Sequence, residues 1–299
     1  MSETTLATRL ERLRALPAPV LWVLGAGLAL LMWYGVIGGL RAGVAPDLAL
    51  KPGAALRPAG SSAAVAYAAR LVERETRDRA FTPNDPIVYP TAFARRTPAF
   101  QRAVIATVSE VLPSLPAVKS GGEDVQPLFE AAQQALTVPP DRYWLAFSWP
   151  PIRRPAERRY LDAVAALADA NARLAEATPP AALAEQSPAV ALRALALVLV
   201  EAAERGEAAI RAGGSSGPVL ASQRGSAYAA VMILRGLRED HAAHIRASAQ
   251  AARWAIAADA LERAANVDPL FSSRSGLVEA GFALLIAARE LDALAGDAP

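Results

Sequence analysis

The longest uninterrupted run of hydrophobic residues covers residues 20–40, where no charged residue occurs. A helix needs about 20 apolar residues to cross the hydrocarbon core of a bilayer. Trp22, Trp33 and Tyr34 lie toward the two ends of the run, where aromatic side chains often meet the membrane interface. The run therefore predicts one transmembrane helix over residues 20–40, preceded by a short N-terminal tail, residues 1–19.

Three alternatives compete with a transmembrane helix. A cleaved signal peptide usually has a shorter apolar segment, of about 7–15 residues, and Pro46 directly after the small residues Gly43 and Ala45 disfavours cleavage. A buried core helix is seldom apolar on every face over this length. A membrane hairpin needs a second span, and no later run is both long and uncharged enough; residues 189–200, for example, contain Arg193.

The charges that flank the run bear on its orientation. Three arginines precede it, and three basic residues follow it at Arg41, Lys51 and Arg57, so the positive-inside rule alone gives no direction. Long domains that follow a first span translocate largely regardless of charge, whereas a short arginine-bearing tail favours the cytoplasm. We therefore expect the large domain to lie outside the cytoplasm.

Beyond the span, the pattern changes twice. Residues 41–60 contain three prolines and three glycines and lack periodicity, which predicts a Pro/Gly/Ala-rich linker. Residues 61–299 then place apolar side chains at intervals of three and four, in segments separated by Pro- and Gly-containing breaks. This second pattern is typical of amphipathic helices, so residues 61–299 are predicted to form one helical domain.

Capping and stop signals mark individual helices of this domain. Ser61 or Ser62 can cap the first helix, and Pro155 can open a long one. Residues 188–211 are apolar nearly all round at their start and are therefore predicted to be the central core helix. No alternating strand pattern extends beyond about four residues. The predicted fold is all-α: one N-terminal transmembrane helix followed by a multi-helix, bundle-like domain.

Composition and charge restrict the chemistry. The net charge is only +2 at pH 7, so no global field attracts nucleic acid, and the chain has no cysteine for disulfides, thiolate catalysis or metal binding. Its two histidines, His241 and His244, could bind a metal with a carboxylate, but no third ligand cluster accompanies them, and a buried structural role for His241 competes. No phosphate-binding loop, dinucleotide fingerprint or zinc signature is present, so no cofactor is expected.

The densest cluster of aromatic and basic residues lies between residues 142 and 159. Its members are Arg142, Tyr143, Trp144, Phe147, Trp149, Arg153, Arg154, Arg158 and Arg159. Arginine offers two-pronged donors to phosphate or carboxylate, and aromatic rings offer stacking surfaces. The cluster is therefore the best candidate binding site, for a lipid headgroup, a glycan or an anionic peptide. In the alternative reading, the rings fill a crevice of the core and the arginines are solvated.

Within the span, Gly35 and Gly39 have the spacing that lets transmembrane helices pack closely. Such packing would give a homo-oligomer. The same spacing also arises by chance in a Gly-rich segment, so both interpretations stay open.

Several stretches of the sequence together resemble a known family. They are Asp78-Arg79-Ala80-Phe81-Thr82-Pro83-Asn84-Asp85-Pro86, Pro98-Ala99-Phe100-Gln101, Arg224-Gly225-Ser226-Ala227-Tyr228, Leu234-Arg235 and Asp240. With the N-terminal span, they resemble an uncharacterised bacterial family of membrane-anchored proteins, known only as a domain of unknown function. Residues 94–96 depart from the Leu-Asp-Asn-like stretch of that family. The resemblance covers most of the chain and implies a bacterial inner-membrane location, but it supplies no activity and no catalytic residue.

These observations predict a non-catalytic binding or scaffold module of the bacterial cell envelope. It would be anchored in the inner membrane, with its large domain in the periplasm. The expected partners are the lipid bilayer and either another envelope protein or an anionic envelope component. The alternative function is an envelope hydrolase or transferase whose carboxylates and histidine, such as Asp85 and His241, are brought together by folding.

Overall fold

The computed structural model describes residues 17–37, 44–86, 89–91, 94–120, 124–143, 154–177, 186–213, 216–242, 245, 250–268 and 274–296. The chain divides into two compact units, Met1–Gly43 with Pro86–Ala94, and Val44–Asp85 with Arg95–Pro299. The described residues contain helices and no strand, which confirms the all-α fold.

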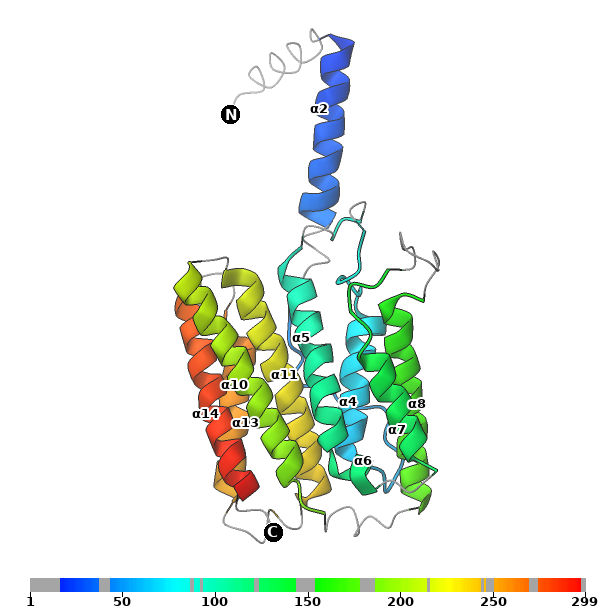
Figure 1. Cartoon of the computed structure of the whole chain (residues 1–299). Coiled ribbons are helices and arrows are strands. Elements are labelled where there is room, and N and C mark those ends of the chain that lie inside the picture. Colours follow the sequence, from blue (N-terminus) through cyan, green and yellow to red (C-terminus); the bar gives the residue numbers. More distant parts are fainter. Residues whose placement is uncertain are drawn as a thin grey trace. The chain divides into compact units, whose positions relative to one another are not determined.

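The first unit contains the apolar helix (Figure 1). Its α-helical part, α2 (Ala18–Leu30), continues as a π-helical segment, η1 (Leu31–Ile37). Together they span 20 residues with a mean hydropathy of 2.1, long and apolar enough to cross a membrane. None of this segment is buried within the protein. The structure therefore differs from the buried core helix that was one alternative for this run.

The second unit is built from helices, as the sequence pattern predicted for residues 61–299 in general. In chain order they are α4 (Ala63–Glu73) with the π-helical η2 (Arg74–Asp78), α5 (Arg96–Val111) with η3 (Leu112–Ser114), α6 (Pro116–Ser120), α7 (Gln126–Leu136), α8 (Ala156–Ala177), α10 (Ala189–Ala212), α11 (Ser216–Asp240), α13 (Ala251–Asn266) and α14 (Arg274–Gly296). Ser62 caps α4, because its side chain accepts a hydrogen bond from the Val65 backbone N–H, and α8 begins directly after Pro155.

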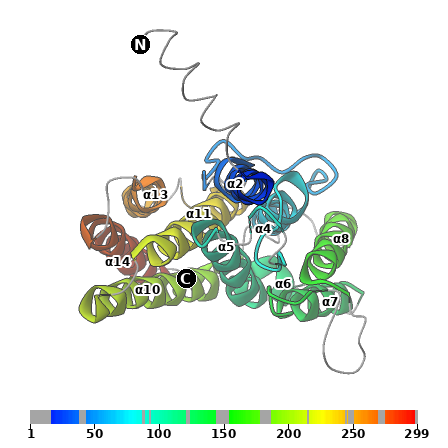
Figure 2. The ribbon, with the colours of Figure 1, turned by 90° about the horizontal axis from the view of Figure 1, so that it is seen from above.

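The central helix of the second unit is α11. Within this unit, α4 and α5 lie on one side of α11 and α13 and α14 on the other (Figure 2), and α11 packs against all four and against α10. The prediction that residues 188–211 form the central core helix is therefore wrong. One face of α10 is buried against α11 and α14, but Leu197 on its outer face is 65% exposed. Hydrophobic pattern alone cannot distinguish a helix covered on all sides from one whose apolar outer face stays open.

Two glycines allow α11 to touch its neighbours closely. A Cβ atom at Gly236 would lie 2.5 Å from the Cα of Ala64, and one at Gly225 would lie 2.5 Å from the backbone oxygen of Phe100. Neither neighbour is the end of a flexible side chain, so a larger residue would force the helix backbones apart. Beside the second contact, the rings of Phe100 and Tyr228 stack with their centroids 5.9 Å apart.

The last residue of α11 also holds the first turn of α4. The Asp240 carboxylate accepts hydrogen bonds from the Ser62 hydroxyl at 2.8 Å, the Ala63 N–H at 2.6 Å and the Ala64 N–H at 3.0 Å. The first N–H groups of a helix lack partners within the helix, and the helix dipole is positive there. One carboxylate at the end of α11 therefore satisfies the start of α4 and ties the two helices together.

We expect Asp240→Ala to destabilise the folded domain by about 2–3 kcal/mol, since it leaves partly buried N–H groups without acceptors. Urea unfolding followed by circular dichroism measures the change. The matched control is Asp259→Ala, which removes an exposed ion pair with Arg263 and should cost less than about 1 kcal/mol. Equal losses in the two variants would show that the cap contributes nothing special.

Candidate functional site

The aromatic–arginine cluster lies only partly within the described residues. Trp144, Phe147, Trp149 and Arg153 lie outside them. At the N-terminal end of the cluster, Tyr143 is partly buried, and the backbone oxygen of Arg142 accepts hydrogen bonds from the Asn84 side-chain amide at 3.3 Å and from the Ala156 N–H at 3.0 Å. The described part of this segment is thus fixed to the start of α8.

The remaining arginines of the cluster stand at the start of α8. Arg154 and Arg159 both approach the Asp162 carboxylate, at 2.9 Å and 3.5 Å, while Arg158 is exposed. Arginine near a helix N-terminus is disfavoured by the helix dipole, which is positive at that end. Asp162 supplies part of the compensating negative charge from within the chain, so these arginines do not by themselves require a bound anion.

The histidine and glycine candidates also lie partly outside the described residues. His241 is buried, His244 and Gly39 lie outside the described residues, and a Cβ atom at Gly35 would meet nothing within 4 Å. No group of three or more potential metal ligands occurs among the described residues. His241 follows the Asp240 cap at the start of α4, whereas Asp85 follows the turn at the far end of η2. Folding therefore does not bring Asp85 and His241 together.

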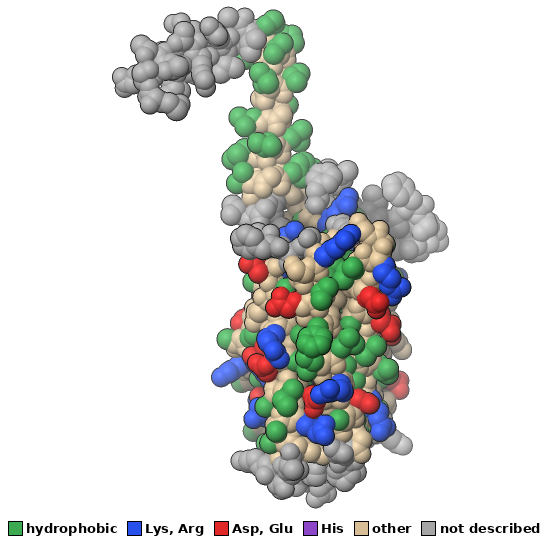
Figure 3. All heavy atoms as spheres, turned by 90° about the vertical axis from the view of Figure 1, so that its left-hand side faces the viewer, with side chains coloured by type: hydrophobic (Ala, Val, Ile, Leu, Met, Phe, Trp, Pro, Cys, Tyr) green, Lys and Arg blue, Asp and Glu red, His purple; other side chains and the backbone are tan. Residues whose placement is uncertain are grey.

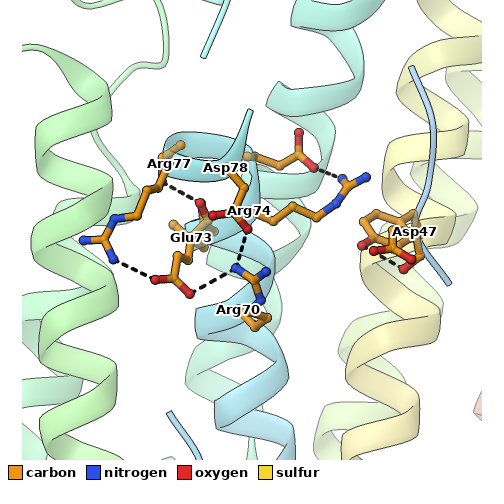
Figure 4. A network of polar contacts seen from close by, with 10 residues as sticks. Asp47, Arg70, Glu73, Arg74, Arg77 and Asp78 are labelled. Carbon is orange, nitrogen blue, oxygen red and sulfur yellow. Dashed lines mark hydrogen bonds and ion pairs between the residues drawn. The ribbon is translucent and has the colours of Figure 1, made fainter. Parts of the chain in front are cut away.

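A polar cluster that the sequence pattern did not single out lies where α4 ends. Glu75 is completely buried and forms an ion pair with Arg74, whose guanidinium carbon lies 5.1 Å from the centroid of the Tyr228 ring. The π-helical turn of η2 widens the helix and shifts the side-chain register, and two consecutive charged residues are buried there. Beside them, Glu73 pairs with Arg70 at 3.1 Å and with Arg77 at 2.8 Å (Figure 4).

The electrostatics of this cluster indicate a structural role. Burial raises the pKa of the Glu75 carboxyl above its ordinary value, although the positive charges of Arg74 and Arg79 act in the opposite direction. Burial also lowers the pKa of Arg79. The Oε2 atom of Glu75 has no hydrogen-bond partner among the described residues. Because solvent does not reach Glu75, this carboxylate is not placed to act on a substrate.

Arg74 instead helps to hold the segment 44–60, here called the strap, against the helices. Its Nη2 donates to the Ala45 backbone oxygen at 2.6 Å, the Tyr228 hydroxyl donates to that of Asp47 at 3.2 Å, and Arg235 donates to that of Leu48. Asn171 of α8 donates to the backbone oxygen of Leu56 at 2.8 Å. The side chains of Leu50 and Leu56 are buried.

The prediction that residues 41–60 form a linker is wrong for residues 44–60. Residues 44–60 belong to the second unit and are packed against it, not free between two parts. No local pattern predicts this packing, because the donors come from distant helices and the acceptors are backbone oxygens.

We expect a chain that begins at Val44 to keep the full stability of the helical domain, and a chain that begins at Ser61 to lose roughly 3–6 kcal/mol. The loss reflects the burial of Leu50 and Leu56, at about 1.5–3 kcal/mol for each side chain. It also reflects buried donors left without acceptors. Urea unfolding of the two chains, followed by circular dichroism, measures the difference. Equal midpoints would mean that residues 44–60 are a linker after all.

The main apolar surface of the second unit lies on α10 and α14. Outside α2 and η1, seven large hydrophobic side chains of the described residues are exposed, and five of them lie on these two helices. They are Val190, Leu197, Val278, Phe282 and Leu285. Figure 3 shows hydrophobic side chains gathered in the middle of this side of the domain, with charged side chains around them. We call this surface the α10–α14 face.

A shallow groove of about 470 Å³ runs along the α10–α14 face. Leu197 and Val200 line it from α10, and Leu285 lines it from α14. Short connections join α10, α11, α13 and α14, and short connections make successive helices antiparallel. In Figure 1, α14 runs antiparallel to α10, so Arg193 near the start of α10 lies at the level of Asp292 near the end of α14, and both line the groove.

The chain matches no known family model, no curated protein and no solved structure. Several residues of the sequence stretches quoted above form contacts between helices and neighbouring segments. Gln101, for example, accepts hydrogen bonds from the N–H and hydroxyl of Thr82 at 3.0 Å and 2.9 Å, and Arg224 donates to the backbone oxygen of Ala265 at 2.9 Å. These contacts hold the fold together.

Proposed function

We propose that this chain is a membrane-anchored, non-catalytic docking module of the bacterial cell envelope, and that its α10–α14 face binds a protein surface. The observation that carries the proposal is the exposure of this face. Phe282 is 67% exposed and Leu197 is 65% exposed, and both lie among further exposed apolar side chains of the same two helices. Monomeric soluble proteins seldom leave a contiguous apolar surface uncovered unless it is an interaction site.

The amino-acid sequence of α10 supports the same conclusion. A helix that is hydrophobic nearly all round is normally covered on all sides. The start of α10 has this composition. Within the described part of the second unit, α10 packs against α14, α11 and α5 on its inner faces, and its outer face stays open. A bound protein on the outer face would complete the burial that this composition favours.

The other candidates support a docking function less well or not at all. Glu75 and Arg74, at the centre of the polar cluster, are closed to solvent, and an enzyme needs titratable groups that a substrate can reach. At the start of α8, Asp162 already pairs with two arginines of the aromatic–arginine cluster. The α10–α14 face, by contrast, is open and its apolar side chains have no partner surface within the described part of the second unit.

The apolar helix Ala18–Ile37 would keep the module at the membrane. The proposed location is the inner membrane, with the helical domain in the periplasm, because the short tail carries three arginines. Alkaline phosphatase fused after residue 299 should then be active, and a fluorescent protein that cannot mature after export should stay dark there. A bright fluorescent fusion with an inactive phosphatase fusion would place the domain in the cytoplasm.

To test the docking function, Leu197→Glu and Phe282→Glu are combined in the full-length chain. Charges at the centre of the face should abolish co-purification of the bound protein from membranes cross-linked before solubilisation. Both side chains are exposed, so the stability of the chain should change by less than about 1 kcal/mol. The matched control is Ile256→Glu on α13, where an apolar side chain of similar exposure, 46%, lies outside the face.

Recovery of the same proteins with the double variant and with the wild-type chain would contradict the docking function of the face. Loss of these proteins in the Ile256→Glu control as well would also contradict it, because the effect would then not depend on the position of the charge.

A further inference from the structure

We propose that the occupant of the α10–α14 face is the same face of a second copy of this chain. Two copies would form an antiparallel four-helix bundle around a two-fold axis that runs along the helices. This proposal rests on the docking function of the face and names its partner. It is supported by the spacing of the exposed residues, by two unpaired opposite charges and by the side of the domain from which the chain leaves.

The spacing of the exposed residues on α14 fits helical partners. Val278, Phe282, Leu285, Arg289 and Asp292 follow one another at intervals of four, three, four and three residues. Intervals of this kind keep a stripe of side chains facing a neighbouring helix along its length. A second α10–α14 pair offers two antiparallel helices with the dimensions of such a partner.

The charges beside the groove indicate that the partner is a copy of the same chain. Arg193 and Asp292 lie at the same level, on opposite helices of the groove, and neither forms an ion pair with any described residue. The neighbouring Arg289 does not compete for Asp292, because it donates to Glu290 at 2.8 Å. The monomer thus presents one cation and one anion that are both unpaired at the edge of an apolar surface.

A two-fold axis along the helices pairs these charges. Under this rotation α10 of one copy faces α14 of the other at the same level, so that Arg193 faces the partner's Asp292. Because a two-fold interface is made of the same contacts twice, Asp292 also faces the partner's Arg193. Between the two ion pairs, Leu197 and Val200 would lie against the partner's Leu285 and cover the apolar centre.

A two-fold axis along the helices is also the one that is compatible with anchoring both copies in one membrane. Val44 begins the strap, and Ala45 is bonded to Arg74 at the end of α4. A two-fold axis along the helices keeps this end of both copies on the same side of the bundle, as two anchors in one membrane require. An axis perpendicular to the helices would place the two anchors at opposite ends. Confinement of both copies to one bilayer also raises their effective concentration, which strengthens a modest interface.

The span offers a second contact between the same two copies. A Cβ atom at Gly35 would meet nothing within 4 Å, so this position leaves room for close approach by another helix. Small residues of this kind are common where transmembrane helices pack. The four-helix bundle does not depend on packing at Gly35. Packing at Gly35 and packing of the α10–α14 faces would bring together the same two chains.

The test is a charge exchange in the full-length chain, reconstituted in detergent micelles and measured by sedimentation equilibrium. Arg193→Asp sets two carboxylates opposite each other at both symmetric positions, and Asp292→Arg sets two guanidinium groups opposite each other. Each single variant should raise the dimer dissociation constant at least tenfold, since like charges at an interface repel. The variant with both changes should return to within about threefold of the wild-type value, because the pairs are restored in reverse.

Two further variants separate the face from the rest of the surface. Leu285→Glu should leave only monomer at the concentrations where the wild-type chain is a dimer, whereas Ile256→Glu should behave as wild type. Circular dichroism of each variant confirms that the helices are intact. Rescue by the charge exchange can occur only if both charges belong to the same type of chain, so a foreign protein or detergent on the face would not produce it.

A wild-type chain that stays monomeric at all concentrations would overturn the proposal, and so would a double variant that associates no better than the single ones. If the chain is monomeric but Leu197→Glu with Phe282→Glu still removes another protein from cross-linked membranes, the docking function stands and its partner is a different protein. If the face variants change neither self-association nor capture, both proposals fail.

Discussion

The second unit depends on how the first turn of α4 is fixed. Asp240 satisfies the N–H groups of this turn from the end of α11, and Asn171 of α8 accepts from the Ser62 N–H at 3.0 Å and donates to the Ser62 oxygen at 3.1 Å. Three helices that are distant in sequence therefore share one junction. The contact at Gly236 lies one turn before Asp240, so close packing and capping fix the same ends of α4 and α11.

This junction explains why the other end of α4 can contain a buried ion pair. Removing charges from water costs free energy unless the geometry is held well enough for them to pair. The core side chains of α4 and the close contact with α11 fix the axis of the helix, and its continuation η2 then brings Arg74 and Glu75 against Tyr228. Arg74 uses a second nitrogen, Nη2, to bind the strap. Because one end of α4 is held firmly, Arg74 at the other end is positioned to bind the strap.

The sequence was sufficient to predict the helices, because each of them needs only a local period and a local stop signal, as at Ser62 and Pro155. It was not sufficient to predict which helix lies at the centre. α10 has the more uniformly apolar pattern, yet α11 is more deeply buried, because glycine and alanine bury backbone without contributing much hydrophobicity. The strap was missed since it is held through its own backbone oxygens, which every residue has. The α10–α14 face was missed since an exposed leucine and a buried leucine look the same in a sequence.

The manner in which the strap is held has a consequence for how this protein tolerates change. Backbone oxygens are present whatever the side chain, so the bonds from Arg74, Tyr228 and Arg235 do not depend on the identity of residues 45, 47 and 48. Leu50 and Leu56 fill space in the core, and Val44 and Leu48 pack against it while partly buried. Many residues of the strap can therefore be substituted while its course over the domain is retained. That course is determined by the donor side chains of the helices beneath it.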